Sequence, residues 1–260
     1  MTTLCDCPRS GLGQWSFRLF GTPVRVKFWF WLALLILGSD RDPAGVLIWV
    51  AVCFVSILLH EMGHVLAFRR YGRWAEVVLY GFGGLAIPDR GVDGAIPEMA
   101  VSAAGPAAGF CLAALTLALA VLTGGHMYVN RYMFLPHVGV VLSYKLLLWT
   151  HSVPFYMHAA TLVNDLLFVN FYWGLVNLLP VWPLDGGHIA RALLEQWDRY
   201  DGRRKSLIAS AVIAAAVALA GVLNQNSWLA IMFGIFAVSS LQLLEGERRR
   251  PIPAYRRWRE

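Results

Sequence analysis

The sequence predicts an α-helical polytopic membrane protein with six transmembrane helices and a small membrane-associated β element. Hydrophobic residues make up 58% of the 260 residues and charged residues only 15%, whereas soluble domains are about 45–50% apolar and about 25% charged. Several apolar runs approach the roughly 20 helical residues that cross a bilayer. The net charge of +6 is typical of basic cytoplasmic segments that contact anionic lipid, so no nucleic-acid partner is expected.

The six expected spans are separated by polar or glycine-containing segments. The first run has only about half the usual length, so it needs its flanks or a thinned bilayer to cross. The runs are 28–38, 44–68, 97–123, 159–179, 206–223 and 228–244. We expect them to form one membrane domain over residues 17–245. A flexible tail, 1–16, and a basic tail, 246–260, are both expected in the cytoplasm.

Two segments predict short strands near the membrane surface. Residues 17–28 alternate loosely around a glycine and a proline, which indicates a strand pair. Residues 69–94 contain an apolar stretch followed by a glycine cluster that includes Gly83 and Gly84. This order predicts a strand, a glycine turn and a second strand.

Residues 136–149 are predicted to be an extracytoplasmic surface or re-entrant element instead of a seventh span. Lys145 interrupts this apolar run. Six spans leave only Arg41, Arg131 and Lys145 of the 22 Lys and Arg residues outside, as the positive-inside rule requires. A seventh span would export the basic segment 191–205 together with the C-terminal tail.

The motif HEMGH, formed by His60, Glu61 and His64, lies in the second apolar run. Side chains four residues apart share one face of a helix, so the two imidazoles can bind one zinc ion. Glu61 can then act as general base on a zinc-bound water. Each charged group at the middle of a membrane helix costs about 2.5–3.5 kcal/mol, so the motif indicates a function.

A catalytic zinc usually has three protein ligands, so a third is needed. His60 precedes Arg69 by nine residues, which places it roughly 13 Å below the cytoplasmic surface. Asp185 lies near the same surface, in a segment with two prolines and two glycines. It is either a turn or capping residue or, joined with HEMGH, the third ligand. Glu98 is more simply an acidic residue in the first turn of a helix. The candidates that fall at the far side are Asp165, His126, His137, His151 and His158.

HEMGH in a membrane helix, followed by NLLP at 177–180 and LDG at 184–186, resembles the site-2 protease family of intramembrane zinc metalloproteases. Weaker features also resemble this family. They are GTPVRVKFWF at 21–30, similar to a surface strand that leads into the first helix, the glycine pair at 83–84, and SAAGP at 102–106. The resemblance covers about residues 17–245.

The resemblance implies one zinc ion per chain, held by His60, His64 and Asp185, with Glu61 as general base. Asn177 would orient the substrate or stabilise the oxyanion. Gly83 and Gly84 would lie near the substrate strand. The implied activity is hydrolysis of a peptide bond within or near the transmembrane segment of a membrane-spanning protein or peptide.

The resemblance implies a compact, sporulation-type member of the family, in which we expect no PDZ domain and no C-terminal nucleotide-sensing domain. Many members carry Asn three residues after the GP pair, where this chain has Gly109. With Gly105 it forms a GxxxG pattern, most simply explained by close helix packing. The expected location is a bacterial inner membrane.

The sequence leaves two alternatives for each of His188 and Asn170. His188 is either a neighbour of the metal ligands or a polar residue at the membrane interface. Asn170 either lines a cavity with Asn177 or makes hydrogen bonds between helices. A transporter or channel would also explain buried His, Glu and Asp, but it does not explain the HExxH spacing joined to LDG. A non-catalytic protease-like scaffold is disfavoured by the intact motif.

Overall fold

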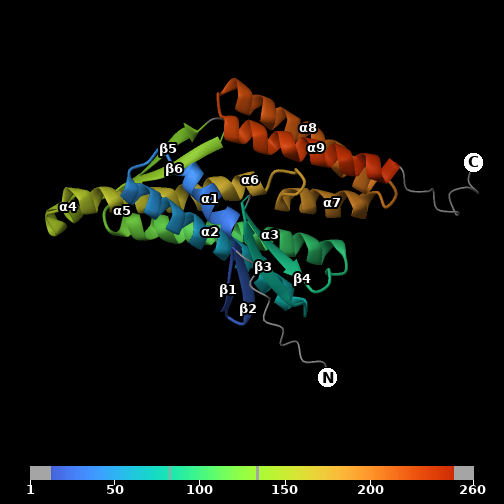
Figure 1. Cartoon of the computed structure of the whole chain (residues 1–260), viewed down its shortest axis with the longest axis horizontal. Coiled ribbons are helices and arrows are strands. Elements are labelled where there is room, and N and C mark those ends of the chain that lie inside the picture. The colour runs from blue at the N-terminus through green and yellow to red at the C-terminus, as the bar shows by residue number, and fades with distance from the viewer. Residues whose placement is uncertain (1–12, 82, 133–134, 249–260) are drawn as a thin grey trace, which may run out of the picture. The chain divides into compact units, whose positions relative to one another are not determined.

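A computed structural model describes residues 13–81, 83–132 and 135–248. The expected tails, 1–16 and 246–260, lie largely outside these residues, although β1 begins at Gln14. The elements, labelled in Figure 1 except for η1, are β1 (Gln14–Leu19), β2 (Thr22–Lys27), α1 (Phe28–Leu37), α2 (Pro43–Arg70), β3 (Ala75–Tyr80), β4 (Gly83–Pro88), α3 (Ala95–Leu122), β5 (His126–Tyr132), β6 (Leu135–Val141), α4 (Tyr144–Thr150), α5 (Val153–Leu167), the π-helical turn η1 (Phe168–Tyr172), α6 (Trp173–Asn177), α7 (Asp185–Trp197), α8 (Gly202–Leu223) and α9 (Ser227–Arg248).

Within the described residues, five helices are long and apolar enough to cross a membrane. They are α2, α3, the continuous run Val153–Asn177, α8 and α9. The first of the six expected spans forms only the 10-residue helix α1, which begins directly after β2 and ends at Leu37, with Gly38 as its C-cap. At about 1.5 Å per residue, α1 rises about 15 Å, half of the hydrocarbon core. The protein is therefore a polytopic, largely helical membrane protein with one helix too short to span alone.

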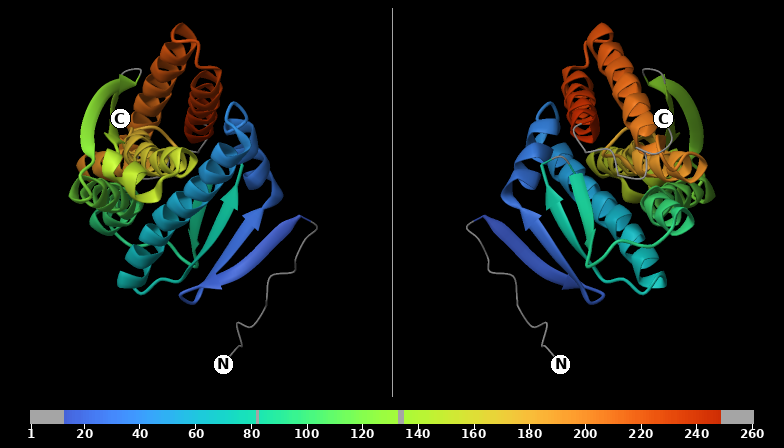
Figure 2. Two further views of the ribbon diagram at one scale, coloured as in Figure 1. Left: turned by 90° about the vertical axis from the view of Figure 1, so that its left-hand side faces the viewer. Right: turned by 90° about the vertical axis from the view of Figure 1, so that its right-hand side faces the viewer.

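The chain divides into two compact units, residues Met1–Asp93 with Ala103–Val176, and residues Gly94–Ser102 with Asn177–Glu260. The first unit contains a four-stranded sheet in the order β1-β2-β3-β4. Both expected strand pairs are confirmed as antiparallel hairpins, and β2 and β3 join them in parallel. Alternate residues of β2 are buried, whereas β3 buries Ala75 and the three consecutive residues Val77, Val78 and Leu79. Helix α2 packs on β3 and β4 (Figure 2).

His126–Tyr132 and Leu135–Val141 form the hairpin of β5 and β6, and Tyr144–Thr150 forms the short helix α4. We expected an extracytoplasmic surface or re-entrant element at 136–149. The side chain of Asn164 in α5 forms hydrogen bonds with the backbone of Val140 in β6. Its Oδ1 accepts the Val140 N–H at 2.9 Å, and its Nδ2 donates to the Val140 carbonyl oxygen at 2.9 Å. The Tyr156 hydroxyl donates to the Leu142 carbonyl oxygen at 2.8 Å. Neither strand nor α4 is long enough to be a span.

The second unit contains α7, α8 and α9, and the last two pack side by side (Figure 1). Helix α7 was not predicted from the sequence. It begins with Asp185, Gly186 and Gly187, and two glycines in a first turn give little local preference for a helix. Contacts with the preceding loop, described below, support this turn instead.

Candidate metal centre

His60 and His64 lie side by side on one face of α2. Their Nε2 atoms are 3.2 Å apart, and their rings meet edge to face with centroids 4.9 Å apart. Two nitrogens bound to one tetrahedral zinc ion at about 2.0–2.1 Å lie about 3.3 Å from each other. The spacing of the two ring nitrogens therefore fits a shared metal ion.

Gly105 of α3 leaves room in front of these nitrogens. A Cβ atom at this position would overlap His64 Nε2 and would lie 2.7 Å from His60 Nε2. Helices α2 and α3 also approach each other closely at this point. A Cβ at Gly63 of α2 would overlap the carbonyl oxygen of Ala104 of α3. Only glycine at position 105 keeps both nitrogens accessible to an ion, so the space in front of the two imidazoles fits a bound metal.

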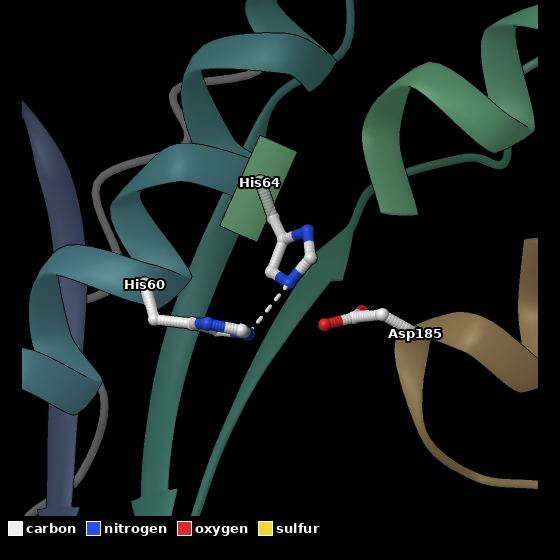
Figure 3. A group of neighbouring side chains, drawn as sticks. All are labelled: His60, His64 and Asp185. Atoms are coloured by element: carbon white, nitrogen blue, oxygen red, sulfur yellow. Dashed lines mark hydrogen bonds between the residues drawn. The ribbon is translucent and has the colours of Figure 1, made fainter. Parts of the chain in front are cut away.

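Asp185 is the first residue of α7. One ligand atom from each of His60, His64 and Asp185 lies within 4.8 Å of the other two (Figure 3). These three residues can hold a metal ion, as expected from the sequence.

The segment that carries Asp185 is tightly packed against itself. A Cβ at Gly186 would overlap the carbonyl oxygens of Leu178 and Leu179, and one at Gly187 would lie 2.6 Å from the carbonyl oxygen of Val181. The glycine pair therefore allows the first turn of α7 to rest directly on the backbone of the preceding loop.

Two rejected candidates are engaged elsewhere. Asp165 Oδ2 accepts a hydrogen bond from Arg41 Nη1 at 2.7 Å. Glu98 pairs with Arg191 of α7. Both carboxylates thus have a cationic partner, which agrees with leaving them out of the ligand set.

Glu61 is buried, with 5% of its surface exposed, and it faces the sheet. A Cβ at Gly84 of β4 would lie 2.6 Å from Glu61 Oε1. Burial raises the pKa of the Tyr80 phenol at the end of β3, and the negative charge of Glu61 raises it further. Gly83, the partner of Tyr80 in the hairpin, does not contact Glu61 in this way. A Cβ at Gly83 would meet open space, but the φ of +137° favours glycine at this position.

The other expected site residues take separate places. Asn177 is buried at the last position of α6. Asn170 lies in the π-helical turn, and its Nδ2 donates to Ser56 Oγ of α2 at 2.8 Å and to the Leu166 carbonyl oxygen at 2.8 Å. These bonds support the reading of Asn170 as a link between helices. The His188 ring packs on Trp182, with centroids 4.5 Å apart.

Residues 48–221 match the family model of peptidase family M50. The chain belongs to peptidase family M50. The match includes both HEMGH and the LDG segment. Membership in M50 agrees with the resemblance inferred from those two motifs.

Relatives of this M50 chain include a zinc metalloprotease of Methanocaldococcus jannaschii, 26% identical over 220 residues that cover 81% of this chain and 54% of that protein. Rip3 of Mycobacterium tuberculosis is 30% identical over 246 residues, which cover 84% of this chain and 55% of Rip3. The chain thus spans about half the length of these relatives. The solved structure of the site-2 protease from Methanocaldococcus jannaschii has the same fold, with a TM-score of 0.54, 23% identity and coverage of 89% of this chain and 95% of that one.

Proposed function

We propose that this protein is an intramembrane zinc metalloprotease. It would hydrolyse a peptide bond within or near the transmembrane segment of a membrane-bound protein or peptide, as in regulated intramembrane proteolysis. The observation that carries this proposal is the group of His60, His64 and Asp185, with ligand atoms within 4.8 Å of one another, next to the carboxylate of Glu61. The M50 family and the zinc metalloproteases among the relatives support it.

The proposed roles follow from the positions of the side chains. One zinc ion per chain, held by the two imidazoles and Asp185, would lower the pKa of a bound water and polarise the scissile carbonyl. Glu61 accepts the proton of the attacking water on a carboxylate oxygen and passes it to the nitrogen of the leaving amine. Asn177 orients the substrate or donates to the oxyanion. Burial around Glu61 and His64 limits the access of bulk water.

The substrate must unwind before it is cleaved, because a helical segment holds its amides in its own hydrogen bonds. The strand β4 is at the edge of the sheet, so its second edge can accept an extended segment as an added strand. Gly83 and Gly84 begin this strand, and the second of them contacts Glu61. We infer that a substrate strand binds along β4, close to the proposed general base.

We also propose an orientation and a location. Both termini face the cytoplasm of a bacterial cell, and the protein resides in the inner membrane. The motivation is the charge distribution, which leaves only Arg41, Arg131 and Lys145 outside when α1, together with its flanking residues, crosses along with the five long helices. The basic cytoplasmic segments contact anionic lipid, and no nucleic acid is involved.

A cleavage assay with purified protein tests this function. The protein in detergent is mixed with a membrane-spanning peptide, and fragments are identified by mass spectrometry, with and without a zinc chelator. We expect cuts in the cytoplasmic half of the span that stop when the chelator is present. Ion flux through proteoliposomes without any cleavage would favour a transporter, and zinc binding without either activity would favour a scaffold.

A further inference from the structure

The loop before Asp185 is tied to both C-terminal helices by two buried serines. The Trp182 N–H donates to Ser210 Oγ of α8 at 2.7 Å. The Oγ atoms of Ser210 and Ser240 of α9 are 2.7 Å apart. Ser240 Oγ also donates to the carbonyl oxygen of Phe236 at 2.9 Å. A continuous row of hydrogen bonds thus runs from the loop through α8 into α9.

The two ends of this row determine its direction. The amide of Trp182 can only donate, and the carbonyl of Phe236 can only accept. The single hydroxyl proton of Ser240 points to Phe236, so the proton of Ser210 points to Ser240. Each hydroxyl then donates once and accepts once. Such a row is cooperative in a low-dielectric interior, and Ser210 and Ser240 are 2% and 0% exposed.

Serines in apolar helices often bond only to their own helix. In this chain Ser239 Oγ donates to the Ile235 carbonyl oxygen at 2.8 Å, and Ser206 Oγ donates to the Arg203 carbonyl oxygen at 2.8 Å. Ser210 instead bonds a loop amide and a second helix. Ser206 of α8 and Ser239 of α9 therefore provide matched controls for Ser210 and Ser240 on the same two helices.

Trp182 precedes Asp185 by three residues, and backbone hydrogen bonds connect the segment around Trp182 to the start of α7. The Leu184 N–H donates to the Val181 carbonyl oxygen at 2.8 Å. The Gly187 N–H donates to the Leu184 carbonyl oxygen at 2.9 Å. Close contact between Gly187 and Val181 leaves little room for the loop to shift without moving the start of α7.

We propose that Ser210 and Ser240 are positioning residues for the metal ligand Asp185. They hold the loop at Trp182, and the loop holds the first turn of α7 in the orientation that presents the carboxylate. The proposal rests on the proposed zinc site. It adds a role for α8 and α9, which contribute none of the three expected ligands.

The direct test measures how fast zinc leaves the purified full-length protein after a chelator is added. We expect Ser210→Ala to release zinc about 10-fold faster than wild type, in the range found when groups that support metal ligands are removed. Ser240→Ala should act in the same direction and less strongly, because Trp182 keeps its acceptor. Ser210→Thr keeps a hydroxyl and should restore slow release. The controls Ser206→Ala and Ser239→Ala should release zinc at the wild-type rate.

A double-mutant cycle separates positioning from general destabilisation. If Ser210 acts through Asp185, Ser210→Ala should not change zinc release further in an Asp185→Ala background. An equal effect of Ser210→Ala in both backgrounds would overturn the proposal. Release from Ser210→Ala that matches Ser206→Ala would overturn it too.

Amide hydrogen exchange at Trp182 tests the hydrogen-bond row without metal. We expect protection of this amide in wild type and in Ser239→Ala, and faster exchange in Ser240→Ala, a variant that leaves the loop contact itself in place. Unchanged exchange would refute the row even if Ser210→Ala does not fold. A wild-type protein that shows this protection but binds no zinc would refute the proposed zinc site and the positioning role, and would leave the row itself confirmed.

Discussion

Gly84 lies directly against Glu61, at a distance where a Cβ atom would be 2.6 Å from Glu61 Oε1. The edge strand of the sheet and the proposed general base are therefore in contact. A peptide bound along β4 would lie next to the carboxylate that receives the proton. The same contact makes position 84 sensitive to any side chain.

Gly84→Val should reduce the cleavage rate by at least about 10-fold and leave zinc bound. The new side chain displaces the carboxylate of Glu61, and a general base contributes about 10²–10⁴-fold to the rate. Turnover and zinc content of the purified variant are measured together. Gly91→Val is the control, because its position in the loop after β4 is open. Equal turnover in the two variants would contradict the proposed contact between strand and base.

Gly105→Ala should remove zinc while the protein stays folded. Its methyl group would occupy the space in front of the His60 and His64 nitrogens, so the ion and the methyl group exclude each other. Metal analysis should show a zinc content at least about 10-fold lower than in wild type, the order of magnitude found when the groups around metal ligands are disturbed. Gly109→Ala is the control on the same helix, since its Cβ would meet Asn170 only at 3.4 Å. Full zinc occupancy in Gly105→Ala would rule out this geometry.

Glu61→Gln should abolish cleavage and keep zinc. The amide preserves the shape of the side chain but cannot accept the proton, so a loss of about 10²-fold or more is expected. A His60→Ala, His64→Ala double variant should, in contrast, lose both the metal and cleavage, because it lacks two of the proposed ligands. Normal turnover in Glu61→Gln would place the general base elsewhere.

Arg41→Ala should lower the melting temperature in detergent, because it leaves the carboxylate of Asp165 without its cation. Removing one partner of a buried pair costs about 3–5 kcal/mol, and we expect less here since 29% of the Arg41 side chain is exposed. The double variant Arg41→Ala, Asp165→Leu should regain much of the loss. If the single and double variants melt alike, the pair contributes nothing measurable to stability.

Cysteine labelling tests the orientation. In a variant without the four native cysteines, an impermeant reagent should reach Ser39→Cys in intact cells and should miss Tyr200→Cys. Both side chains are exposed, and neither substitution disturbs the pair of Arg41 and Asp165. Labelling of position 200 in intact cells would reverse the proposed topology.

Much of the site could be inferred from local patterns. Helical periodicity brings His60 and His64 together at a spacing of four residues, and membrane depth selected Asp185 among the carboxylates. Apolar length predicted the long spans. Alternation around Gly21 and Pro23 predicted the first sheet hairpin, and the glycine cluster that includes Gly83 and Gly84 predicted the second. Length alone also warned that the first run was short, and α1 indeed has only 10 residues.

Other features depend on contacts between residues far apart in the chain. No local pattern states that Gly105 faces the two imidazoles, that Gly84 touches Glu61 or that Ser210 accepts the Trp182 amide. Helix α7 has two glycines in its first turn because this turn rests directly on the loop backbone, and helix propensity cannot reveal such a contact. Periodicity and hydropathy are properties of neighbouring residues, so they predict the helices and the metal motif. The close approaches that leave space for an ion and hold its ligands arise only when separate segments pack.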